Sequence, residues 1–183
     1  MKLNKVFWAA FLANSVFFTT ARKNYSEGAG TALSVDSLGD AYLLFLNQID
    51  PDNNPLAVEP RILLVPPALF VKATQLMQAT ELRDTSASTK YLITNPMAGK
   101  FRVQMSTYLS SSLTGNSAKA WYLLADPQDL PLIEVAFLNG REQPTVEQAE
   151  AEFNTLGIQF RGYFDFGVAL QDWRGGVKFK GEA

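Results

Sequence analysis

The chain has 183 residues, of which 47% are hydrophobic and 19% are charged, a composition typical of one globular domain or two small interleaved ones. It contains no cysteine and no histidine, which excludes disulfides and thiolate nucleophiles and removes the commonest general base and metal ligand. The net charge of −2 differs from the strongly positive balance of a dedicated nucleic-acid binder. The composition therefore argues against most enzyme mechanisms.

The N-terminal segment is predicted to start with a short helix over Leu3–Leu12, followed by an extended piece at Phe17 and Phe18. Apolar residues at helical spacing would form the buried stripe of this helix: Leu3, Val6, Phe7, Ala10 and Phe11. The segment also resembles a secretory signal peptide. We expect it to be retained, because Asn14 and Ser15 interrupt the apolar run. No run in the chain reaches the length of a membrane span.

The clearest helix follows a loop over Asn24–Thr31. Ser34 is a good N-cap and Asp36 lies in the first turn, where the helix dipole favours an acid. The predicted buried face repeats every three or four residues: Val35, Leu38, Tyr42, Phe45 and Ile49. The helix should end before Pro51, because the residue that precedes a proline avoids helical geometry.

The next segments are predicted as a buried strand, a helix and a surface loop. Arg61–Val65 is a short apolar run, and Pro67 suits the first position of a helix that runs to about Thr80. The inward residues of that helix would be Leu69, Ala73, Leu76 and Met77. Arg83–Lys90 is polar and is predicted as the loop.

The C-terminal half is predicted to be mostly strand. Three strands are expected at Phe101–Ser106, Ala118–Ala125 and Leu132–Leu138. Asn139-Gly140 is a hairpin-turn signal that would close the third strand.

A short helix and a long strand are expected to complete the fold. Thr145 and Gln148 match a capping box for a helix that ends near Phe153. In the strand Ile158–Leu170, one parity should be buried, including Phe160, Phe164 and Phe166, and the other should face water, including Arg161 and Asp165. Helices and strands alternate without a regular rhythm, which indicates the α+β class.

Several patterns could carry chemistry, and each has a simpler interpretation. Asp50, Asp52 and Asn54 imitate a calcium loop, but Pro55 and Arg61 occupy the places that require glycine and glutamate, so a solvated turn is favoured. Gly28 and Gly30 imitate a phosphate loop without its remaining residues. Glu147, Glu150 and Glu152 are expected on the exposed side of the short helix, and no paired catalytic carboxylates are assigned.

Aromatic and basic residues leave two interpretations open. Trp8, Trp121, Tyr122 and Trp173 could stack on bases, although core or subunit contacts are favoured. Two basic clusters are either solvated patches or weak contacts for phosphate: Lys2, Lys5, Arg22 and Lys23, and Arg174, Lys178 and Lys180. We expect no catalytic residue, no cofactor site and no metal site.

An ordered set of motifs spread over most of the chain resembles the C-terminal part of tailed-phage major capsid proteins, of the kind described as Mu-like head subunits or as fused to a prohead protease. The motifs are GTALSVDSL at 30–38, RILLVPP at 61–67, TNPMAGKF at 94–101, AWYLLADP at 120–127, IEVAFLNG at 133–140, FDFGV at 164–168 and WRGG at 173–176.

The resemblance implies the Hong Kong ninety-seven phage capsid fold, an α+β fold with a peripheral and an axial domain. Residues 1–27 would hold the end of the spine helix and the start of the peripheral domain, 28–131 most of the axial domain, and 132–183 the peripheral strands and a short helix. The N-terminal arm, the extended loop and most of the spine helix are not matched. For a chain without them we expect a monomer or small ring in dilute solution.

The resemblance also implies a structural role in the virion capsid and not an enzyme. The partners would be further copies in pentamers and hexamers, the portal, a scaffold or prohead protease, and packaged double-stranded DNA in non-specific contact, with no membrane. The host cytoplasm would hold the subunit before assembly. Two alternatives remain: an encapsulin-type compartment shell, and a small carboxylate-based hydrolase or ligand-binding domain.

Overall fold

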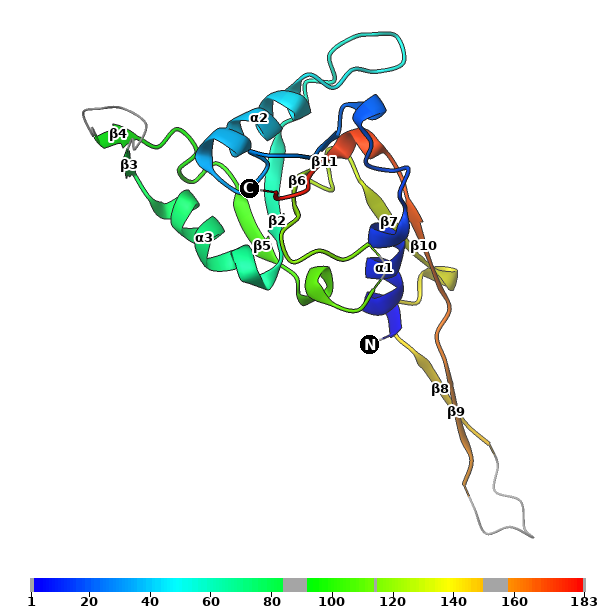
Figure 1. Cartoon of the computed structure of the whole chain (residues 1–183). Helices are drawn as coiled ribbons and strands as arrows, with labels where there is room; N and C mark the ends of the chain where they lie inside the picture. Colours follow the sequence, from blue (N-terminus) through cyan, green and yellow to red (C-terminus); the bar gives the residue numbers. More distant parts are fainter. Residues whose placement is uncertain (1, 84–91, 114, 150–157, 183) are drawn as a thin grey trace.

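The computed structural model describes residues 2–83, 92–113, 115–149 and 158–182 (Figure 1). It is a mixed α+β structure, as the sequence predicts. The helices are α1 (Lys2–Ala13), α2 (Val35–Leu46) and α3 (Pro67–Gln78). The strands are β1 (Tyr25–Ser26), β2 (Pro60–Val65), β3 (Glu81–Arg83), β4 (Leu92–Thr94), β5 (Arg102–Met105), β6 (Trp121–Ala125), β7 (Ile133–Phe137), β8 (Thr145–Gln148), β9 (Phe160–Tyr163), β10 (Phe166–Leu170) and β11 (Gly176–Phe179).

A five-stranded sheet in the order β1-β11-β6-β2-β5 forms the centre of the molecule. The inner pairs β11–β6 and β6–β2 are antiparallel, whereas both outer pairs, β1–β11 and β2–β5, are parallel. The sheet therefore joins strands from both ends of the chain, since β1 and β11 lie side by side.

Alternation along β2 and β6 gives the sheet two buried faces. Leu63 and Trp121 point to the face that α2 and α3 cover, where Leu38, Phe45 and Met77 complete the larger hydrophobic core. Leu64, Tyr122 and Leu124 point to the other face. A strand with both faces buried reads as a continuous apolar run, which explains the composition of RILLV and WYLLA.

The second face is covered by α1 and by the two-stranded sheet of β7 and β10. Phe11 and Phe18 pack against Tyr122 with ring centroids 5.1 and 5.5 Å apart. Leu132 joins the same cluster, and α1 packs along β10. The three layers are therefore α2 and α3, the central sheet, and α1 with the β7–β10 pair (Figure 1).

Local signals set the starts of α2 and α3. The Ser34 hydroxyl accepts a hydrogen bond from the Ser37 N–H over 3.1 Å, and the Ser37 hydroxyl accepts one from the Ser34 N–H over 2.9 Å, which completes a capping box. Pro67 occupies the first helical position of α3, where its missing N–H costs nothing. Both helices are confirmed, and α2 ends before Pro51 as expected.

Beyond β7 and β10 the chain continues as a long hairpin that leaves the body (Figure 1). β8 pairs with β9 in antiparallel register, and the Leu138 N–H donates to the Asp165 carbonyl oxygen where the two ribbons join. We call the part formed by β8, β9 and Ile158 the arm.

The predicted turn at Asn139-Gly140 is wrong as a chain reversal. Both residues have positive φ, 55° and 68°, but they form a bend in the outgoing strand, because the partner of β7 is β10 and not β8. The Asn-Gly pair correctly predicted residues with a left-handed backbone conformation. It could not report that the strand resumes at Thr145.

The predicted helix after Thr145 is also wrong in the residues that the structure describes. Thr145–Gln148 is β8, and its partners across the hairpin are Tyr163, Gly162, Arg161 and Phe160. Strand pairing here prevails over the capping-box pattern, and Glu147 lies on a strand. Glu150 and Glu152 lie outside the described residues.

The predicted long strand is two strands, and its burial differs between them. In β10 the parity is confirmed, because Phe166, Val168 and Leu170 are half-buried while Gly167 and Ala169 are exposed. In β9 Phe160 is 65% exposed, so its predicted burial is wrong. Nothing in the described chain covers the arm on that side.

Smaller differences between the predicted and the observed structure arise from contacts between residues that are distant in sequence. Phe17 and Phe18 are buried in a turn instead of an extended piece, and Tyr25–Ser26 is a strand inside the expected loop. Val6 and Ile49 are exposed although both were assigned to buried stripes. Arg83 ends β3, and residues 84–90 of the expected loop lie outside the described residues.

Candidate assembly surface

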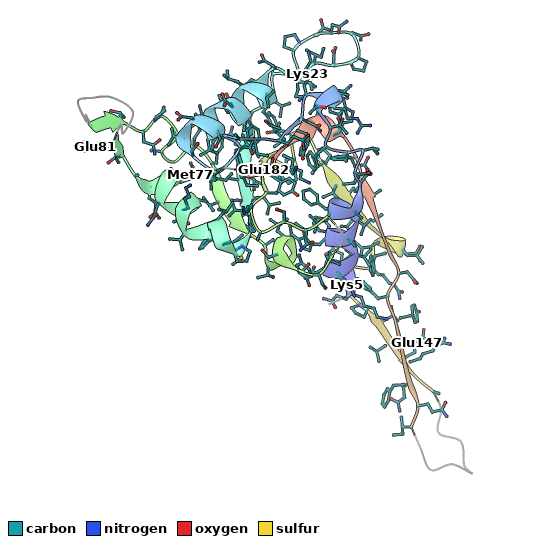
Figure 2. The ribbon with its side chains drawn as sticks, in the orientation of Figure 1. Lys5, Lys23, Met77, Glu81, Glu147 and Glu182 are labelled. Carbon is teal, nitrogen blue, oxygen red and sulfur yellow. The ribbon has the colours of Figure 1, made fainter. Side chains whose placement is uncertain are left out.

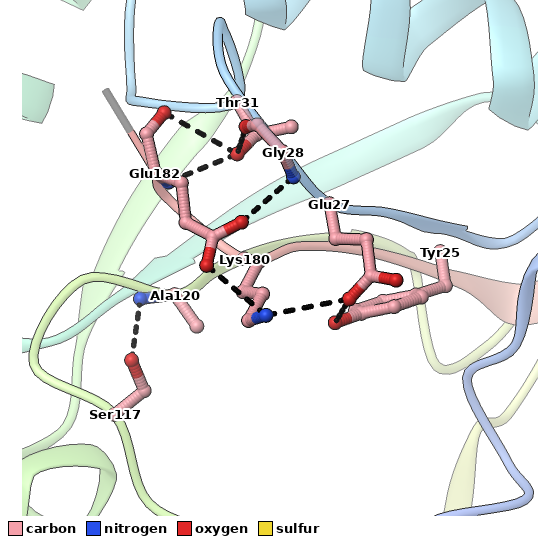
Figure 3. Close-up of polar contacts among 8 residues, drawn as sticks. All are labelled: Tyr25, Glu27, Gly28, Thr31, Ser117, Ala120, Lys180 and Glu182. Atoms are coloured by element: carbon pink, nitrogen blue, oxygen red, sulfur yellow. Dashed lines mark hydrogen bonds and ion pairs between the residues drawn. The ribbon is translucent and has the colours of Figure 1, made fainter.

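The two loops that imitate ligand sites are structural turns. The Asp50 carboxylate accepts hydrogen bonds from the Asn54 backbone N–H over 2.8 Å, from the Asn54 side-chain amide over 3.1 Å and from the Asp52 backbone N–H over 2.8 Å. These bonds, those from Asn54 first, lower the pKa of Asp50. The Gly28 N–H donates to the Glu182 carboxylate over 2.7 Å (Figure 3). In the described ranges, no group of three acidic side chains lies close enough to hold a metal ion.

The Gly28 loop is joined to the C-terminal residues by a polar network (Figure 3). Lys180 lies between two carboxylates, 3.4 Å from Glu27 and 3.0 Å from Glu182. The Thr31 hydroxyl accepts a hydrogen bond from the Glu182 N–H over 2.9 Å. The hydrogen bonds from Lys180 and Gly28 lower the pKa of Glu182. This network keeps β1 and β11 together at the edge of the sheet.

The basic cluster near the C-terminus is engaged inside the molecule. Arg174 lies 3.1 Å from Asp172 and donates to the Ile49 carbonyl oxygen over 2.8 Å. Burial lowers the pKa of Lys178, which lies near the rings of Tyr25 and Tyr122. These cations are not an open phosphate-binding patch. In the N-terminal cluster, Lys2, Lys5 and Lys23 are exposed (Figure 2).

The aromatic residues that could have stacked on bases lie mainly in the core. Trp121 is fully buried, and its indole N–H donates to the Thr31 carbonyl oxygen over 3.0 Å. Tyr122 is 2% exposed. Trp8 and Trp173 are half-buried against the second core. The interpretation as core aromatics is confirmed for Trp121 and Tyr122.

Two acids line one surface pocket, which bears on the hydrolase alternative. Glu27 and Asp40 both contribute to its wall. Glu27 is already paired with Lys180 and accepts a hydrogen bond from the Tyr25 hydroxyl over 3.0 Å. The Glu27 carboxylate is therefore engaged in the polar network at the edge of the sheet.

The arm has a polar face that holds its two strands together. The Arg161 Nε donates to a Glu147 carboxylate oxygen over 2.6 Å, and the Tyr163 hydroxyl donates to the other oxygen over 3.1 Å. These two hydrogen bonds, Arg161 first, lower the pKa of Glu147. Glu147 projects from the hairpin well outside the body (Figure 2).

The opposite face of the arm is apolar and uncovered. The register places Val146 across from Gly162 and Gln148 across from Phe160, on the face away from the ion pair. Val146, Ile158 and Phe160 are 68%, 59% and 65% exposed. Isolated exposed apolar residues are ordinary, but a contiguous set at the end of a projection is typical of a contact surface.

The body carries an apolar groove beside α1, with a volume of about 210 Å³. Gln104 is the one polar residue in its lining as the structure describes it. The groove lies where α1 and β7 leave part of the second face of the central sheet open. Its apolar walls include Phe7, Trp8, Leu64, Leu124, Leu130 and Ile133.

Sequence reasoning missed both the arm and the groove. One available signal was the series of alternating apolar residues that includes Ile158 and Phe160. This series is longer than the stretch of strand that packs against the body. The sequence assigned that parity to the core, because it does not reveal where a projecting ribbon leaves the body. The groove is lined by residues of α1, β2, β5, β6 and β7. No local sequence pattern indicates that these elements lie together.

Comparison with known proteins identifies a family and similar solved structures. A family model described as phage capsid protein matches residues 1–179. No curated protein matches the chain. Among solved structures, the chain is similar to a chain of the satellite phage P4 procapsid including size determination (Sid) protein, with 14% identity and a TM-score of 0.38. The similarity covers 87% of this chain but only 42% of that one.

Proposed function

Since the chain belongs to the phage capsid protein family, a family of structural proteins, we propose that it is a subunit of the icosahedral head that encloses phage double-stranded DNA. The family match over residues 1–179 is the observation that carries the proposal. The proposed role is structural and not catalytic, and copies of the chain are the principal partners.

The architecture proposed for the subunit is that of the Hong Kong ninety-seven fold. In this proposal the central sheet with α2 and α3 is the axial domain, and α1 with the β7–β10 pair belongs to the peripheral domain. Residues 28–131 supply most of the axial part. We add β11 to it, because this strand lies between β1 and β6 in the central sheet.

The surface of the chain supports a role in assembly. A projecting hairpin with an uncovered apolar face costs solubility in a protein that works alone. The same face is useful in a shell, because each subunit meets several others and can bury it there. Pentamers and hexamers are the rings that we propose these contacts hold together.

Other partners follow from the proposed head and remain proposals. They are the portal, a scaffold or prohead protease during assembly, and packaged DNA in weak contact with exposed lysines such as Lys2, Lys5 and Lys23. We propose the host cytoplasm as the site of the subunit before assembly. No helix among the described residues has both the length and the apolar character to cross a bilayer.

Purified particles test the proposed function. Lysates from cells that produce the phage would be treated with nuclease, sedimented, and digested for mass spectrometry. We expect peptides of this chain to be major components of particles that protect DNA. Particles that contain this chain and protein cargo instead of DNA would favour a compartment shell, and absence of the chain from every large particle would contradict the proposal.

A further inference from the structure

We propose that the arm of one copy inserts Phe160 into the apolar groove beside α1 of a second copy. The inference rests on the proposed function, because it names the surfaces through which subunits of the shell hold one another. Three observations support it: the uncovered face of the arm, the lining of the groove, and the direction in which the arm leaves the body.

The arm is a structure that needs a partner. A single two-stranded ribbon is marginally stable in water, and here the Glu147–Arg161 pair holds only one of its faces. On the other face Val146, Ile158 and Phe160 stay mostly exposed. Covering that face would stabilise the strands and remove apolar surface from water at the same time.

The groove suits protein side chains better than a free ligand. Its volume of about 210 Å³ lies below the range of about 300–1,000 Å³ that is usual for small-molecule sites. Its walls offer apolar surface and Gln104 but no charged residue among those that line it. An aromatic ring with aliphatic neighbours matches this lining in chemistry.

The occupant must come from another molecule. The arm runs past the N-terminal end of α1 and away from the central sheet (Figure 1), whereas the residues that line the groove lie on α1, on strands of the body and between β6 and β7. The arm and the groove are different surfaces of one chain. A contact between them is therefore head-to-tail, and such contacts close into rings or continue from subunit to subunit.

The area of the proposed contact is consistent with one of several contacts that each subunit makes in a shell. Three side chains that are 59–68% exposed offer apolar surface on the order of several hundred Å². A stable pair usually buries about 1,200–2,000 Å² in total. The contact is thus weak between two isolated subunits and becomes effective when a ring supplies several contacts to each copy.

Cysteine crosslinking tests the contact directly, because the chain contains no cysteine of its own. Gln148→Cys places a thiol on the arm opposite Phe160 and keeps the ring in place, and Gln104→Cys places one in the groove. We expect a short bifunctional maleimide to join the two variants when they are mixed under assembly conditions. Ala68→Cys is the control, because Ala68 is exposed on α3, which covers the other face of the sheet.

The outcomes separate this inference from the proposed function. Assembled particles without arm-to-groove crosslinks, or with crosslinks only between two Gln148→Cys arms, would overturn the inference and leave the capsid role standing. Failure of the unmodified chain to enter any particle would overturn the capsid role and the inference with it. Crosslinks between Gln148→Cys and Gln104→Cys that exceed those to Ala68→Cys support the inference.

A second pair of variants separates contact from folding. Phe160→Ala should weaken association roughly tenfold to a hundredfold, as expected for the loss of one buried aromatic side chain. Gln159→Ala changes an exposed side chain on the opposite face of the arm, keeps the Glu147–Arg161 pair, and should change association by less than about threefold. Equal weakening by both variants, with circular dichroism unchanged, would show that association does not depend on the Phe160 ring and would overturn the inference.

Discussion

The side-chain amide of Asn24 donates a hydrogen bond to the backbone carbonyl oxygen of Trp173 over 3.1 Å, although the two residues are 149 positions apart. The same amide donates to the Phe17 carbonyl oxygen over 3.0 Å, and its own oxygen accepts from the Thr19 N–H over 2.9 Å. Asn24 is fully buried. One side chain thus joins the segment after α1 to the turn that precedes β11.

Replacing Asn24 should therefore destabilise the whole molecule. Asn24→Ala removes one buried and two partly buried hydrogen bonds to backbone groups, and we expect the free energy of unfolding to fall by about 3 kcal/mol. Urea denaturation followed by circular dichroism measures the loss. Asn4→Ala, at an exposed position of α1, is the control and should change stability by less than about 0.5 kcal/mol. Equal stability of the two variants would refute the role of Asn24.

Two glycines separate backbone strain from close packing. Gly115 has φ +81°, and a Cβ there would lie 2.2 Å from the Leu12 carbonyl oxygen at the end of α1. Gly99 has φ +67° with open space around it. Gly99→Ala should cost about 1–2 kcal/mol from backbone strain alone.

Gly115→Ala should cost at least about 1 kcal/mol more than Gly99→Ala, because either α1 or the loop must also move. Denaturant unfolding of both variants gives the difference. Similar losses in the two variants would mean that α1 adapts to the added methyl group without strain.

Two phenylalanines of the same parity should respond differently to truncation. Phe164 is half-buried, with its ring 5.8 Å from Phe137 and 5.2 Å from Phe166. Phe164→Ala should lower the free energy of unfolding by about 1–3 kcal/mol, less than the full cost at a buried site. Phe160→Ala should change it by less than about 0.5 kcal/mol in the isolated subunit. Melts that show a larger loss for Phe160→Ala would contradict the exposed position of the arm.

Acid should weaken the network at the C-terminus. Folding lowers the pKa of Glu182 below its ordinary value of 4.5, because Lys180 and the Gly28 N–H favour the carboxylate. The stabilisation is present above about pH 4.5 and is lost as the pH falls through the lowered folded pKa.

Glu182→Gln should therefore flatten part of the dependence of stability on pH below about pH 5. Urea unfolding of both proteins at several pH values between about 3 and about 7 tests this. Parallel curves would show that Glu182 is not held as the carboxylate, whereas convergence of the two curves at low pH is the expected result.

Elements with local signals could be predicted from the sequence. Ser34 and Pro67 determine where α2 and α3 start, and the uninterrupted apolar runs of β2 and β6 reflect burial on both faces. The pairing of β1 with β11 could not be predicted, since a two-residue strand has no periodicity of its own. It depends on distant partners such as Glu27 and Lys180.

The conformation and burial of the arm, at the candidate assembly surface, also could not be predicted from local sequence. Thr145 and Gln148 form a valid local helix signal, but pairing with β9 decides the conformation. The alternation that predicted a strand at Phe160 was sound, whereas the inference of burial failed. Whether an apolar side chain lies in a core or projects from a ribbon depends on where the body ends, and local sequence does not carry that information.

The most direct test of the capsid assignment is an icosahedral cryo-electron microscopy reconstruction of particles that contain this chain. We expect the five-stranded sheet, with α2 and α3 on one face, to repeat in every subunit of the shell and to surround the axes of the pentamers and hexamers. A well-resolved shell whose subunits cannot accommodate this sheet, with the chain located elsewhere in the particle or outside it, would contradict the account.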